Sequence, residues 1–396
     1  TITPNSISIT DLDGVSVNPR EYQISWDSAA AQKGGYPHFM LKEIFEQPKA
    51  VADTLIGRLH SGKILLDELS LTSAEIKNLK KIVVLACGTA YHAGMVAKYS
   101  IEKWSHIPVE VELASEFRYR DPIVDKETLV IAISQSGETM DTLMALRHAK
   151  DSGAKVLAIC NTNSSTIPRE SDAVIYTHAG PEIAVASTKA FLTQVVATYL
   201  IGLYLGQVMG TLNERQIETL YNEMLELPAK IEQILETVEP LRELTRSFAD
   251  STSVLFLGRH VGYPVALEGA LKLKELAYMH AEGFAGGELK HGPIALIDQG
   301  TPVIAIVPNT HENGLDEKML SNIQEVRARG AKVIAIAAEG TEVPGAAHVI
   351  RIPNAPQLLQ PVLTTVPLQV FAYEMAVTRG NDVDQPRNLA KSVTVE

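Results

Sequence analysis

Short, unbroken apolar runs alternate along this chain with longer segments whose apolar residues recur at helical spacing. In the first half, such runs cover residues 81–87, 129–133, 155–160 and 173–176, and residues 109–113 predict a further short strand. An unbroken apolar run is typical of a strand that is buried on both faces of a parallel sheet. Because these runs alternate with helical segments, the pattern predicts an α/β fold in which helices cover both faces of a parallel sheet.

Two of the helical segments have features of their own. Residues 39–59 carry apolar side chains at helical spacing, but Pro48 lies among them and is expected to kink or split the helix. Residues 187–205 predict a long, largely buried helix. Its most apolar part, residues 195–205, is too short and too interrupted to span a bilayer, so no membrane partner is expected.

The second half of the chain repeats the strand pattern of the first half. Three predicted strands recur in the same order about 170 residues later; the matching pairs are 84–88 with 254–258, 130–133 with 303–306, and 155–159 with 332–336. A period of this length predicts a duplicated domain and not a solenoid. We expect an arm or linker over residues 1–35, a first domain over 36–212, a second domain over 213–380 and a tail over 381–396.

Composition narrows the class of protein. With 396 residues, of which 45% are apolar and 21% charged, the chain has material for two to three globular domains. Its formal net charge of −12 argues against a nucleic-acid partner or an anionic membrane surface, so any phosphate site must be local. Its two cysteines, Cys87 and Cys160, fit a reducing compartment, and the N-terminus has no signal-peptide pattern. We therefore expect a cytoplasmic protein.

The strand at 129–133 runs into the hydroxyl-rich loop Ser134-Gln-Ser-Gly-Glu-Thr139, and a helical segment begins at Met140. A helix N-terminus offers unpaired N–H groups and the positive end of a dipole to a phosphate, and this loop adds three hydroxyls and a glycine. A simple N-cap without a ligand would use one hydroxyl, from Ser136 or Thr139. The density of donors favours an anion site over a cap, although no Walker A sequence follows.

A second loop is expected to share this crevice. Ligands of open α/β sheets lie beyond the carboxyl ends of the strands, and Cys87-Gly-Thr89 follows such an end. The equivalent of the hydroxyl-rich loop in the second half, Val307-Pro-Asn-Thr-His-Glu-Asn313, has few small hydroxyls. We therefore expect one phosphate site, in the first half.

The densest cluster of ionisable groups is Glu268-Gly-Ala-Leu-Lys-Leu-Lys-Glu275. The spacing places Glu268, Lys272 and Glu275 on one face of a helix. A charged face of this kind is commonly solvated and laced with salt bridges. The leucines around these three residues break the amphipathic stripe, which indicates partly buried charge.

Two segments after this cluster carry further candidates. The glycine-rich segment 281–293 is expected to form a loop that positions Glu288, Lys290 and His291, and His291 suits acid–base chemistry near neutral pH. The tail from residue 382 carries Arg387 and Lys391 and has little helical pattern. A frayed terminus is one interpretation, but its apolar residues indicate that it docks on the body: Leu389, Val393 and Val395.

These motifs resemble the isomerase half of the glutamine–fructose-6-phosphate aminotransferase family, which is built from SIS (sugar-isomerase) domains. The resemblance covers nearly the whole chain and rests on six motifs: Cys87–Thr89, Ser134–Thr139, Glu182-Ile-Ala-Val-Ala-Ser-Thr-Lys-Ala-Phe191, Glu268–Glu275, Gly287-Glu-Leu-Lys-His-Gly-Pro293 and Asp384-Gln-Pro-Arg-Asn-Leu-Ala-Lys-Ser-Val-Thr-Val-Glu396. It implies two tandem SIS domains, each a flavodoxin-like three-layer sandwich with a parallel sheet between helices.

The resemblance also implies binding residues. The phosphate of the substrate would be held by Thr89, Ser134, Gln135, Ser136 and Thr139. The rest of the substrate would contact Val185, Ser187 and Ala390. Ala90 stands where some members of the family have serine, so one contact is expected to be missing there.

The catalytic roles implied by the resemblance fall on four residues. His291 would open the sugar ring, Lys391 would form a Schiff base with the open-chain ketose, Glu275 would move the proton between C1 and C2, and Lys272 would stabilise charge on oxygen. The Schiff base needs a neutral amine, so the tail must enter a drier site. Neither a metal nor an organic cofactor is implied.

The implied substrate is fructose 6-phosphate, with glucosamine 6-phosphate as the product when ammonia is supplied and glucose 6-phosphate without it. The family assembles as homodimers in which His291 comes from the neighbouring subunit. A glutaminase domain precedes this region in full-length members, so the chain that begins at Thr1 is expected to lack glutamine hydrolysis.

Two alternatives share the fold. A non-catalytic sensor of phosphosugars would keep the phosphate loop but would not need Glu275, His291 and Lys391 together. A deglycase of fructosamine phosphates would be expected to lack the tail motif Asn388-Leu-Ala-Lys391. The combination present here favours the enzyme.

Overall fold

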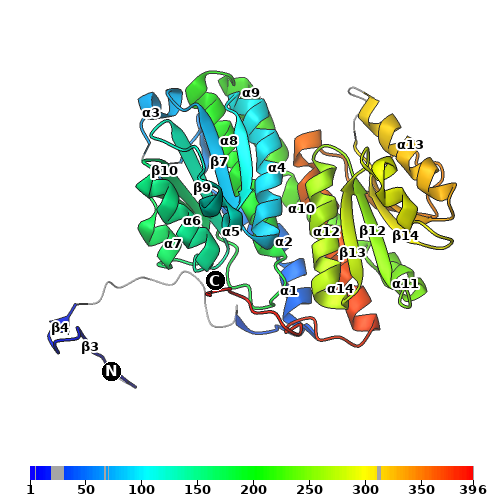
Figure 1. The fold of residues 1–396 in the computed structure, drawn as a ribbon, viewed down its shortest axis with the longest axis horizontal. Coiled ribbons are helices and arrows are strands. Elements are labelled where there is room, and N and C mark those ends of the chain that lie inside the picture. The colour runs from blue at the N-terminus through cyan, green and yellow to red at the C-terminus, as the bar shows by residue number, and fades with distance from the viewer. Residues whose placement is uncertain (5, 19–30, 67, 70, 310–313, 396) are drawn as a thin grey trace.

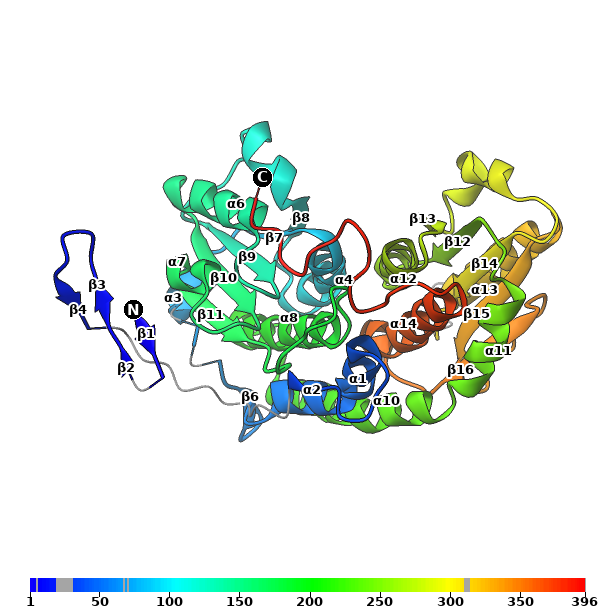
Figure 2. The same ribbon diagram turned by 90° about the horizontal axis from the view of Figure 1, so that it is seen from below.

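The structure is a computed structural model that describes residues 1–4, 6–18, 31–66, 68–69, 71–309 and 314–395. It contains two five-stranded parallel sheets, one in each half of the chain (Figures 1 and 2). The first sheet has the order β11-β10-β9-β7-β8. Its strands lie where the apolar runs predicted them: β7 Lys81–Ala86, β8 Val109–Leu113, β9 Thr128–Ser134, β10 Lys155–Cys160 and β11 Ala173–Tyr176.

The second sheet repeats the first strand for strand. Its order is β13-β12-β14-β15-β16, and every neighbouring pair is parallel. Each strand therefore has the same position as its counterpart in the first sheet, with the second strand of the half at one edge, as in flavodoxin-like folds. The predicted duplication is confirmed. The strands are β12 Ser253–Gly258, β13 His280–Ala285, β14 Pro302–Ile306, β15 Lys332–Ala338 and β16 His348–Ile352.

One strand lies where the sequence predicted a loop. Residues 280–285 form β13, and the predicted loop begins only after them, with the short 3-10 helices η3 (Leu289–His291) and η4 (Pro293–Leu296). Gly283 of β13 packs against α12 (Gly262–Ala277), because a Cβ there would lie 2.8 Å from the backbone nitrogen of Leu267. The glycine that indicated a loop thus serves close packing of a strand on a helix.

Helices cover both faces of each sheet. The helices between the two sheets form one continuous hydrophobic core with the inner faces of both: α4 Gly88–Ser105, α8 Lys189–Met209, α12 and α14 Gln360–Thr378. The outer faces carry separate cores under α6 Met140–Asp151 and α7 Thr166–Glu170 in the first half and α13 Leu315–Arg327 in the second. The predicted α/β architecture of tandem three-layer units is confirmed.

Helix α8 is long and apolar enough to cross a membrane by length and composition, but 83% of its apolar window is buried inside the protein. It is a core helix, as predicted from residues 187–205. Pro48 splits the N-terminal helical segment as expected, because α1 (Phe39–Phe45) ends and α2 (Gln47–Leu55) begins at Glu46. The shorter helices α3 Ser73–Lys77 and α5 Ala114–Phe117 lie in the first half.

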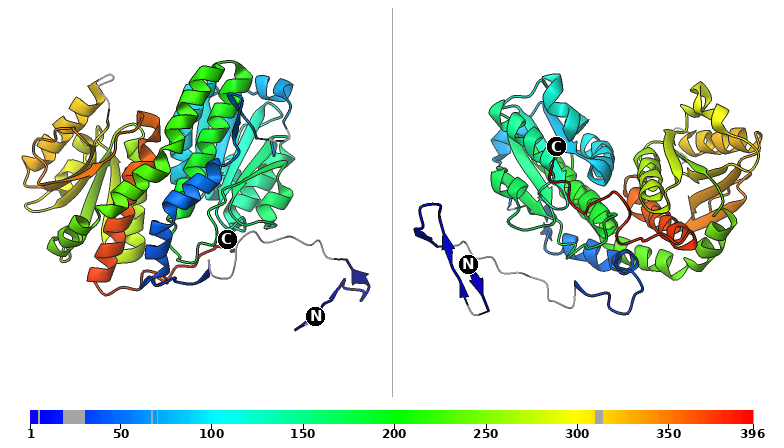
Figure 3. Two further views of the ribbon diagram at one scale, coloured as in Figure 1. Left: turned by 180° about the vertical axis from the view of Figure 1, so that it is seen from behind. Right: turned by 60° about the horizontal axis from the view of Figure 1, so that its bottom comes forward.

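The two halves are joined by three successive helices, α9 Glu214–Leu225, α10 Leu227–Glu236 and α11 Glu239–Ser247. Helix α10 contacts α2 of the first half and α14 of the second, so the connection is packed onto both. At the N-terminus, short antiparallel pairs with exposed side chains project from the body (Figures 1 and 3): β1 Ile2–Thr3 with β2 Ser6–Ile7, and β3 Ile9–Thr10 with β4 Ser16–Val17. A further pair, β5 Leu59–His60 with β6 Lys63–Ile64, follows α2.

After α14 the tail crosses from the second half back to the first (Figures 2 and 3). It docks as predicted, but not through the apolar residues that suggested docking. Leu389, Val393 and Val395 are all largely exposed, whereas Val383 is buried. The contacts are polar instead, because the carbonyl oxygen of Val393 accepts a hydrogen bond of 3.1 Å from the Met140 N–H at the start of α6.

Candidate active site

A cavity of about 120 Å³ lies beyond the carboxyl ends of β7 and β9, at the edge where the sequence placed the crevice. Seven predicted site residues line it, and the tail contributes one of them: Thr89, Ser134, Gln135, Ser136, Thr139, Ser187 and Lys391. Cys87, Ala90, Ile133 and Gln194 complete the lining. Ala90 therefore does face the cavity, and it brings no hydroxyl to it.

The loop after β9 is held by its own hydroxyls. The hydroxyls of Ser134 and Thr139 lie 2.9 Å apart, and Ser134 Oγ accepts a hydrogen bond of 3.0 Å from the Gly137 N–H. Gly137 has φ +68°, and a Cβ at this position would overlap Ser165. Thr139 is the N-cap residue of α6 by position, but its side chain makes no capping hydrogen bond. The loop hydroxyls thus shape the cavity rather than cap the helix.

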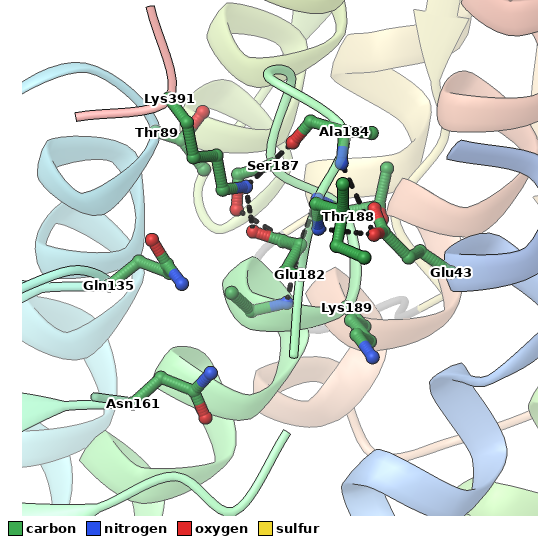
Figure 4. A network of polar contacts seen from close by, with 12 residues as sticks. Glu43, Thr89, Gln135, Asn161, Glu182, Ala184, Ser187, Thr188, Lys189 and Lys391 are labelled. Atoms are coloured by element: carbon green, nitrogen blue, oxygen red, sulfur yellow. Dashed lines mark hydrogen bonds and ion pairs between the residues drawn. The ribbon is translucent and has the colours of Figure 1, made fainter. Parts of the chain in front are cut away.

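The tail lysine enters the same cavity. Lys391 Nζ lies 2.5 Å from Glu182 Oε2 and donates a hydrogen bond of 2.8 Å to the carbonyl oxygen of Ala184 (Figure 4). Next to it, the hydroxyl of Ser392 lies 3.1 Å from that of Ser136 in the hydroxyl-rich loop. The tail is therefore fixed between the loop after β9 and the segment that precedes α8.

Glu182 is fully buried and has two kinds of partner. Its Oε1 accepts hydrogen bonds from the backbone N–H groups of Thr188 (2.9 Å) and Ala190 (3.0 Å) at the start of α8, and its Oε2 faces Lys391. Burial alone would raise the pKa of this carboxyl, but the Lys391 ammonium and these hydrogen bonds bring it below the ordinary value. Glu182 is therefore an anion held at a helix N-terminus.

A second buried carboxyl lies behind the first. Glu43, on α1, accepts hydrogen bonds from the backbone N–H groups of Ile183 (2.5 Å) and Ala184 (3.2 Å). Its Oε2 is buried and has no hydrogen-bond partner among the described residues. Burial and the negative charge of Glu182 raise the pKa of Glu43 to about 8. At neutral pH this carboxyl is thus mostly protonated.

The charged face predicted on residues 268–275 lies on α12 and is buried, as the leucine pattern indicated. Lys272 Nζ lies 2.6 Å from Glu275 Oε2, 3.4 Å from Glu268 Oε1 and 3.0 Å from the hydroxyl of Thr89. Thr89 donates to Glu268 Oε1 (3.0 Å), and His92 Nδ1 lies 2.7 Å from Glu268 Oε2. The cluster joins α12 of the second half to the cavity edge formed by α4.

The charges in this cluster stabilise one another. Burial by itself would lower the pKa of Lys272, but the carboxylates of Glu275 and Glu268 raise it above the ordinary value. Burial would likewise raise the pKa of Glu268, which Lys272 and His92 bring below its ordinary value. Lys272 is therefore a permanent cation next to the less buried Glu275.

Five predicted site residues lie outside the cavity lining in the part of the chain that the structure describes: Lys272 and Glu275 of the α12 cluster, Val185, His291 and Ala390. His291 is exposed on η3, and Ala390 is exposed in the tail. The backbone N–H of Val185 donates to the Asp384 carbonyl oxygen (3.0 Å) and so links the segment before α8 to the tail. Residues 310–313, which belong to the loop expected to lack a phosphate site, lie outside the described residues.

Sequence reasoning missed three residues. Gln194 on α8 is buried, lines the cavity, and has an Oε1 without a hydrogen-bond partner among the described residues. The sequence feature that could have identified Gln194 is a lone amide side chain within an apolar helical segment. Glu182 belongs to the motif at residues 182–191, but no function was predicted for it. Glu43 lies in a segment that contains none of the motifs.

Comparisons with known proteins agree with this architecture. The SIS domain family matches residues 75–204 and 247–379. A glutamine–fructose-6-phosphate aminotransferase (isomerizing) from Streptomyces coelicolor is 64% identical over 396 residues, and one from Corynebacterium diphtheriae is 61% identical over 401 residues. The alignments cover 99% and 100% of this chain, which spans about 64% of the length of each relative.

A solved structure is also similar. The C-terminal domain of glucosamine–fructose-6-phosphate aminotransferase from Francisella tularensis superimposes with a TM-score of 0.85 at 43% sequence identity. The match covers 89% of this chain and 100% of the solved domain. Both the fold and the sequence of that domain therefore correspond to nearly the whole chain.

Proposed function

This chain belongs to the SIS domain family, as the isomerase part of a glutamine–fructose-6-phosphate aminotransferase, and we propose that it converts fructose 6-phosphate and ammonia to glucosamine 6-phosphate. One observation carries the proposal. The cavity beside the hydroxyl-rich loop also holds the amine of Lys391, brought there by the tail. A phosphate sensor has no need of a lysine at that place.

The phosphate is proposed to lie at the loop after β9. Ser134, Gln135, Ser136 and Thr139 line the cavity there, and Thr89 faces it from the start of α4. Hydroxyl and amide donors at the carboxyl ends of parallel strands suit a phosphate dianion without a basic surface, which agrees with the net charge of −12. We propose that Ser187, which lines the cavity, contacts the sugar, together with Val185 and Ala390 of the adjoining segments.

The chemistry is proposed to follow from a lysine and a carboxylate. The amine of Lys391 attacks C2 of the open-chain ketose, and loss of water leaves an iminium at C2. Ammonia then attacks C2 and displaces the lysine, which leaves the free imine of the sugar and restores the amine of Lys391. Glu275 takes a proton from C1 and returns one to C2, which converts this imine to the 2-amino aldehyde, while the Lys272 cation stabilises charge on oxygen. Glu275 suits this role because it is less buried than Glu268 and is held by Lys272 at 2.6 Å.

The test is a steady-state assay of the chain with fructose 6-phosphate, with and without added ammonium. We expect glucose 6-phosphate without ammonium and glucosamine 6-phosphate with it. Lys391→Arg and Glu275→Gln are expected to lower kcat by at least about a hundredfold. Lys274→Arg, on the exposed face of the same helix, is the matched control and should keep wild-type turnover. Unchanged turnover in both active-site variants rejects the proposal.

The ring-opening residue is proposed to be His291 of a second copy of the chain, in a homodimer. His291 is exposed on η3, outside the lining of the cavity in the described part of its own chain. If it acts across the interface, mixing inactive Lys391→Arg with inactive His291→Asn chains restores one complete site in each mixed dimer. Random exchange then returns about a quarter of the wild-type activity. No recovery in dimers shown to have exchanged contradicts the shared site.

The source of ammonia and the cellular location are part of the same proposal. In the full-length relatives, ammonia is proposed to come from a preceding glutaminase domain, so the assay supplies ammonium in its place. Both cysteines are free thiols, with Cys160 buried and Cys87 partly buried. Free thiols fit a reducing cytoplasm, where fractionation of the intact protein is expected to find it.

A further inference from the structure

The amine of Lys391 already has two hydrogen-bond partners where it lines the cavity. Its Nζ lies 2.5 Å from a carboxylate oxygen of Glu182 and 2.8 Å from the Ala184 carbonyl oxygen, which both stabilise an ammonium. An ammonium has no lone pair and cannot attack a carbonyl carbon. A Schiff base at Lys391 therefore requires a group that removes a proton from this nitrogen.

One oxygen of Glu182, Oε2, faces this nitrogen, and the other is held by the backbone at the start of α8. Its Oε1 is occupied by the backbone N–H groups of Thr188 and Ala190, so the carboxyl group cannot rotate away without leaving the start of α8 unpaired. Its side chain has no exposure to solvent, whereas that of Lys391 is 24% exposed toward the cavity. The second oxygen of a fixed carboxylate thus points at the lysine (Figure 4).

We propose that Glu182 is the catalytic proton acceptor for Lys391 and the donor for the departing water. The inference rests on the proposed function. Glu182 takes one proton from the ammonium, and the freed lone pair forms the bond from Nζ to C2. The second nitrogen proton moves to the former carbonyl oxygen, which gives a carbinolamine. Glu182 then protonates that hydroxyl, which leaves as water, and the nitrogen lone pair closes the iminium.

The transfer becomes favourable when the sugar fills the cavity. An ion pair loses hydration when water is displaced, whereas a neutral amine beside a neutral carboxylic acid has little hydration to lose. A donor and an acceptor that lie 2.5 Å apart need no movement to exchange the proton. The balance of charge is also kept, because the iminium that forms is again a cation beside the restored carboxylate.

Among the described residues around Glu182, no other group places a negative charge next to Lys391 at pH 7. Glu43 faces it from α1 and is mostly neutral at pH 7, since its pKa is raised to about 8. Lys272 faces it from α12 and stays charged within its own cluster. Lys189 of α8 is paired with Glu46 at 2.7 Å. Below about pH 7, a change in the lysine's reactivity therefore reports mainly on Glu182, whereas above it the ionisation of Glu43 contributes as well, which Glu43→Gln removes.

The experiment traps the Schiff base with borohydride in the presence of fructose 6-phosphate and follows the mass of the chain from pH 6 to 9. Glu182→Gln keeps an acceptor for the α8 N–H groups but cannot take a proton. We expect its trapping rate to fall at least about tenfold at pH 7 and to rise about tenfold per pH unit, because hydroxide must then deprotonate the lysine. The wild type should vary much less.

Glu43→Gln is the matched control, because it makes the same change at the adjacent buried carboxyl that does not touch Lys391. It should trap at the wild-type rate at pH 7. Glu182→Asp, which keeps a carboxylate, should be slower than wild type but without the steep rise with pH. An equal loss at every pH in Glu182→Gln, or faster trapping than wild type, overturns the proposal, because the carboxylate would then only position the tail.

The controls also separate this inference from the proposed function. If the wild type itself forms no adduct at Lys391 with fructose 6-phosphate, the proposed function fails. If the wild type forms the adduct and Glu182→Gln forms it with the same rate and pH profile, only the role of Glu182 fails. Circular dichroism and calorimetric binding of fructose 6-phosphate to Lys391→Arg and Glu182→Gln confirm that each variant is folded and still binds the phosphate.

Discussion

The ammonium of Lys272 donates a hydrogen bond of 3.0 Å to the hydroxyl of Thr89, a residue 183 positions earlier in the chain. Thr89 belongs to α4 at the edge of the first sheet's cavity, and Lys272 belongs to α12 of the second half. The same hydroxyl donates to Glu268. Thr89 thus links a charged cluster of the second half to the candidate phosphate site of the first half, next to the contact of His92 with Glu268.

Replacing Thr89 by Val keeps the shape of the side chain and removes this link. The Thr89→Val chain should lose about 1–3 kcal/mol of unfolding free energy, because Lys272 and Glu268 remain charged and buried with one partner fewer. Thr89→Ser keeps the hydroxyl and should lie close to wild type. Urea unfolding followed by circular dichroism measures both. Equal stability of the valine and serine variants would contradict the link.

Lys272 should be among the most sensitive positions of α12. Lys272→Met leaves the buried carboxylate of Glu268 without its nearest cation, for which a loss of about 3–5 kcal/mol is expected. Lys274→Met on the exposed side of the helix makes the same substitution and should stay within about 0.5 kcal/mol of wild type. Thermal melts of the two variants at pH 7 provide the comparison, and similar melting temperatures would refute the buried-charge argument.

Glu43 should make stability depend on pH. Its pKa in the folded chain is raised from 4.5 to about 8 by burial and by Glu182, so the folded state holds a proton that the unfolded state releases. This contribution to stability is complete below pH 4.5 and is lost as the pH rises toward 8. Glu43→Gln cannot ionise, so its stability relative to wild type should grow over that window, on the order of 2–4 kcal/mol by pH 8.

The measurement for Glu43 is the melting temperature of wild type and Glu43→Gln at intervals from pH 5 to 9. Each kcal/mol corresponds to about 2–4 °C for a domain of this size. Glu218→Gln, an exposed carboxyl on α9, is the control and should follow the wild-type curve. A constant difference between Glu43→Gln and wild type at all pH values would show that Glu43 is ionised throughout.

Gly137 should be far less replaceable than Gly88, although both have a positive φ and both precede or begin a helix at the cavity. A Cβ at Gly137 would overlap Ser165, whereas one at Gly88 would meet no atom within 4 Å. Gly88→Ala should therefore cost about 1–2 kcal/mol of backbone strain alone. Gly137→Ala should cost more and also weaken binding of fructose 6-phosphate, as measured by calorimetry. A smaller effect at Gly137 would speak against the tight loop.

Local patterns in the sequence were sufficient for the fold. The apolar runs that begin near Lys81, Leu129 and Lys155 mark strands because a strand covered on both faces excludes polar residues wherever it lies. The recurrence of these runs revealed the duplication, since the strands of both sheets are buried on both faces and therefore have similar apolar sequences. Two strands of the second sheet, β13 and β16, were not predicted. The prediction failed at β13 for a local reason, because glycines such as Gly283 signal a loop and a tightly packed strand equally well.

The candidate site was predictable only as far as its motifs are local. Ser134–Thr139 forms one loop, and Glu268, Lys272 and Glu275 share one helix face, so spacing alone placed each group together. The spacing of residues did not show that the loop and the helix face lie near each other in the fold. It depends on how α4 and α12 pack between the two sheets, which no stretch of sequence encodes by itself.

The amino-acid sequence by itself determined the strands of the first sheet, three strands of the second, their repetition, the hydroxyl-rich loop and the family, because each depends on residues that are neighbours in the chain. Only the tertiary structure decided that the tail docks by polar contacts, with Leu389 and Val393 exposed, and that Lys391 meets Glu182 across 209 positions. The physical reason is that burial follows a local period, whereas the pairing of two charges follows from the path of the backbone between them.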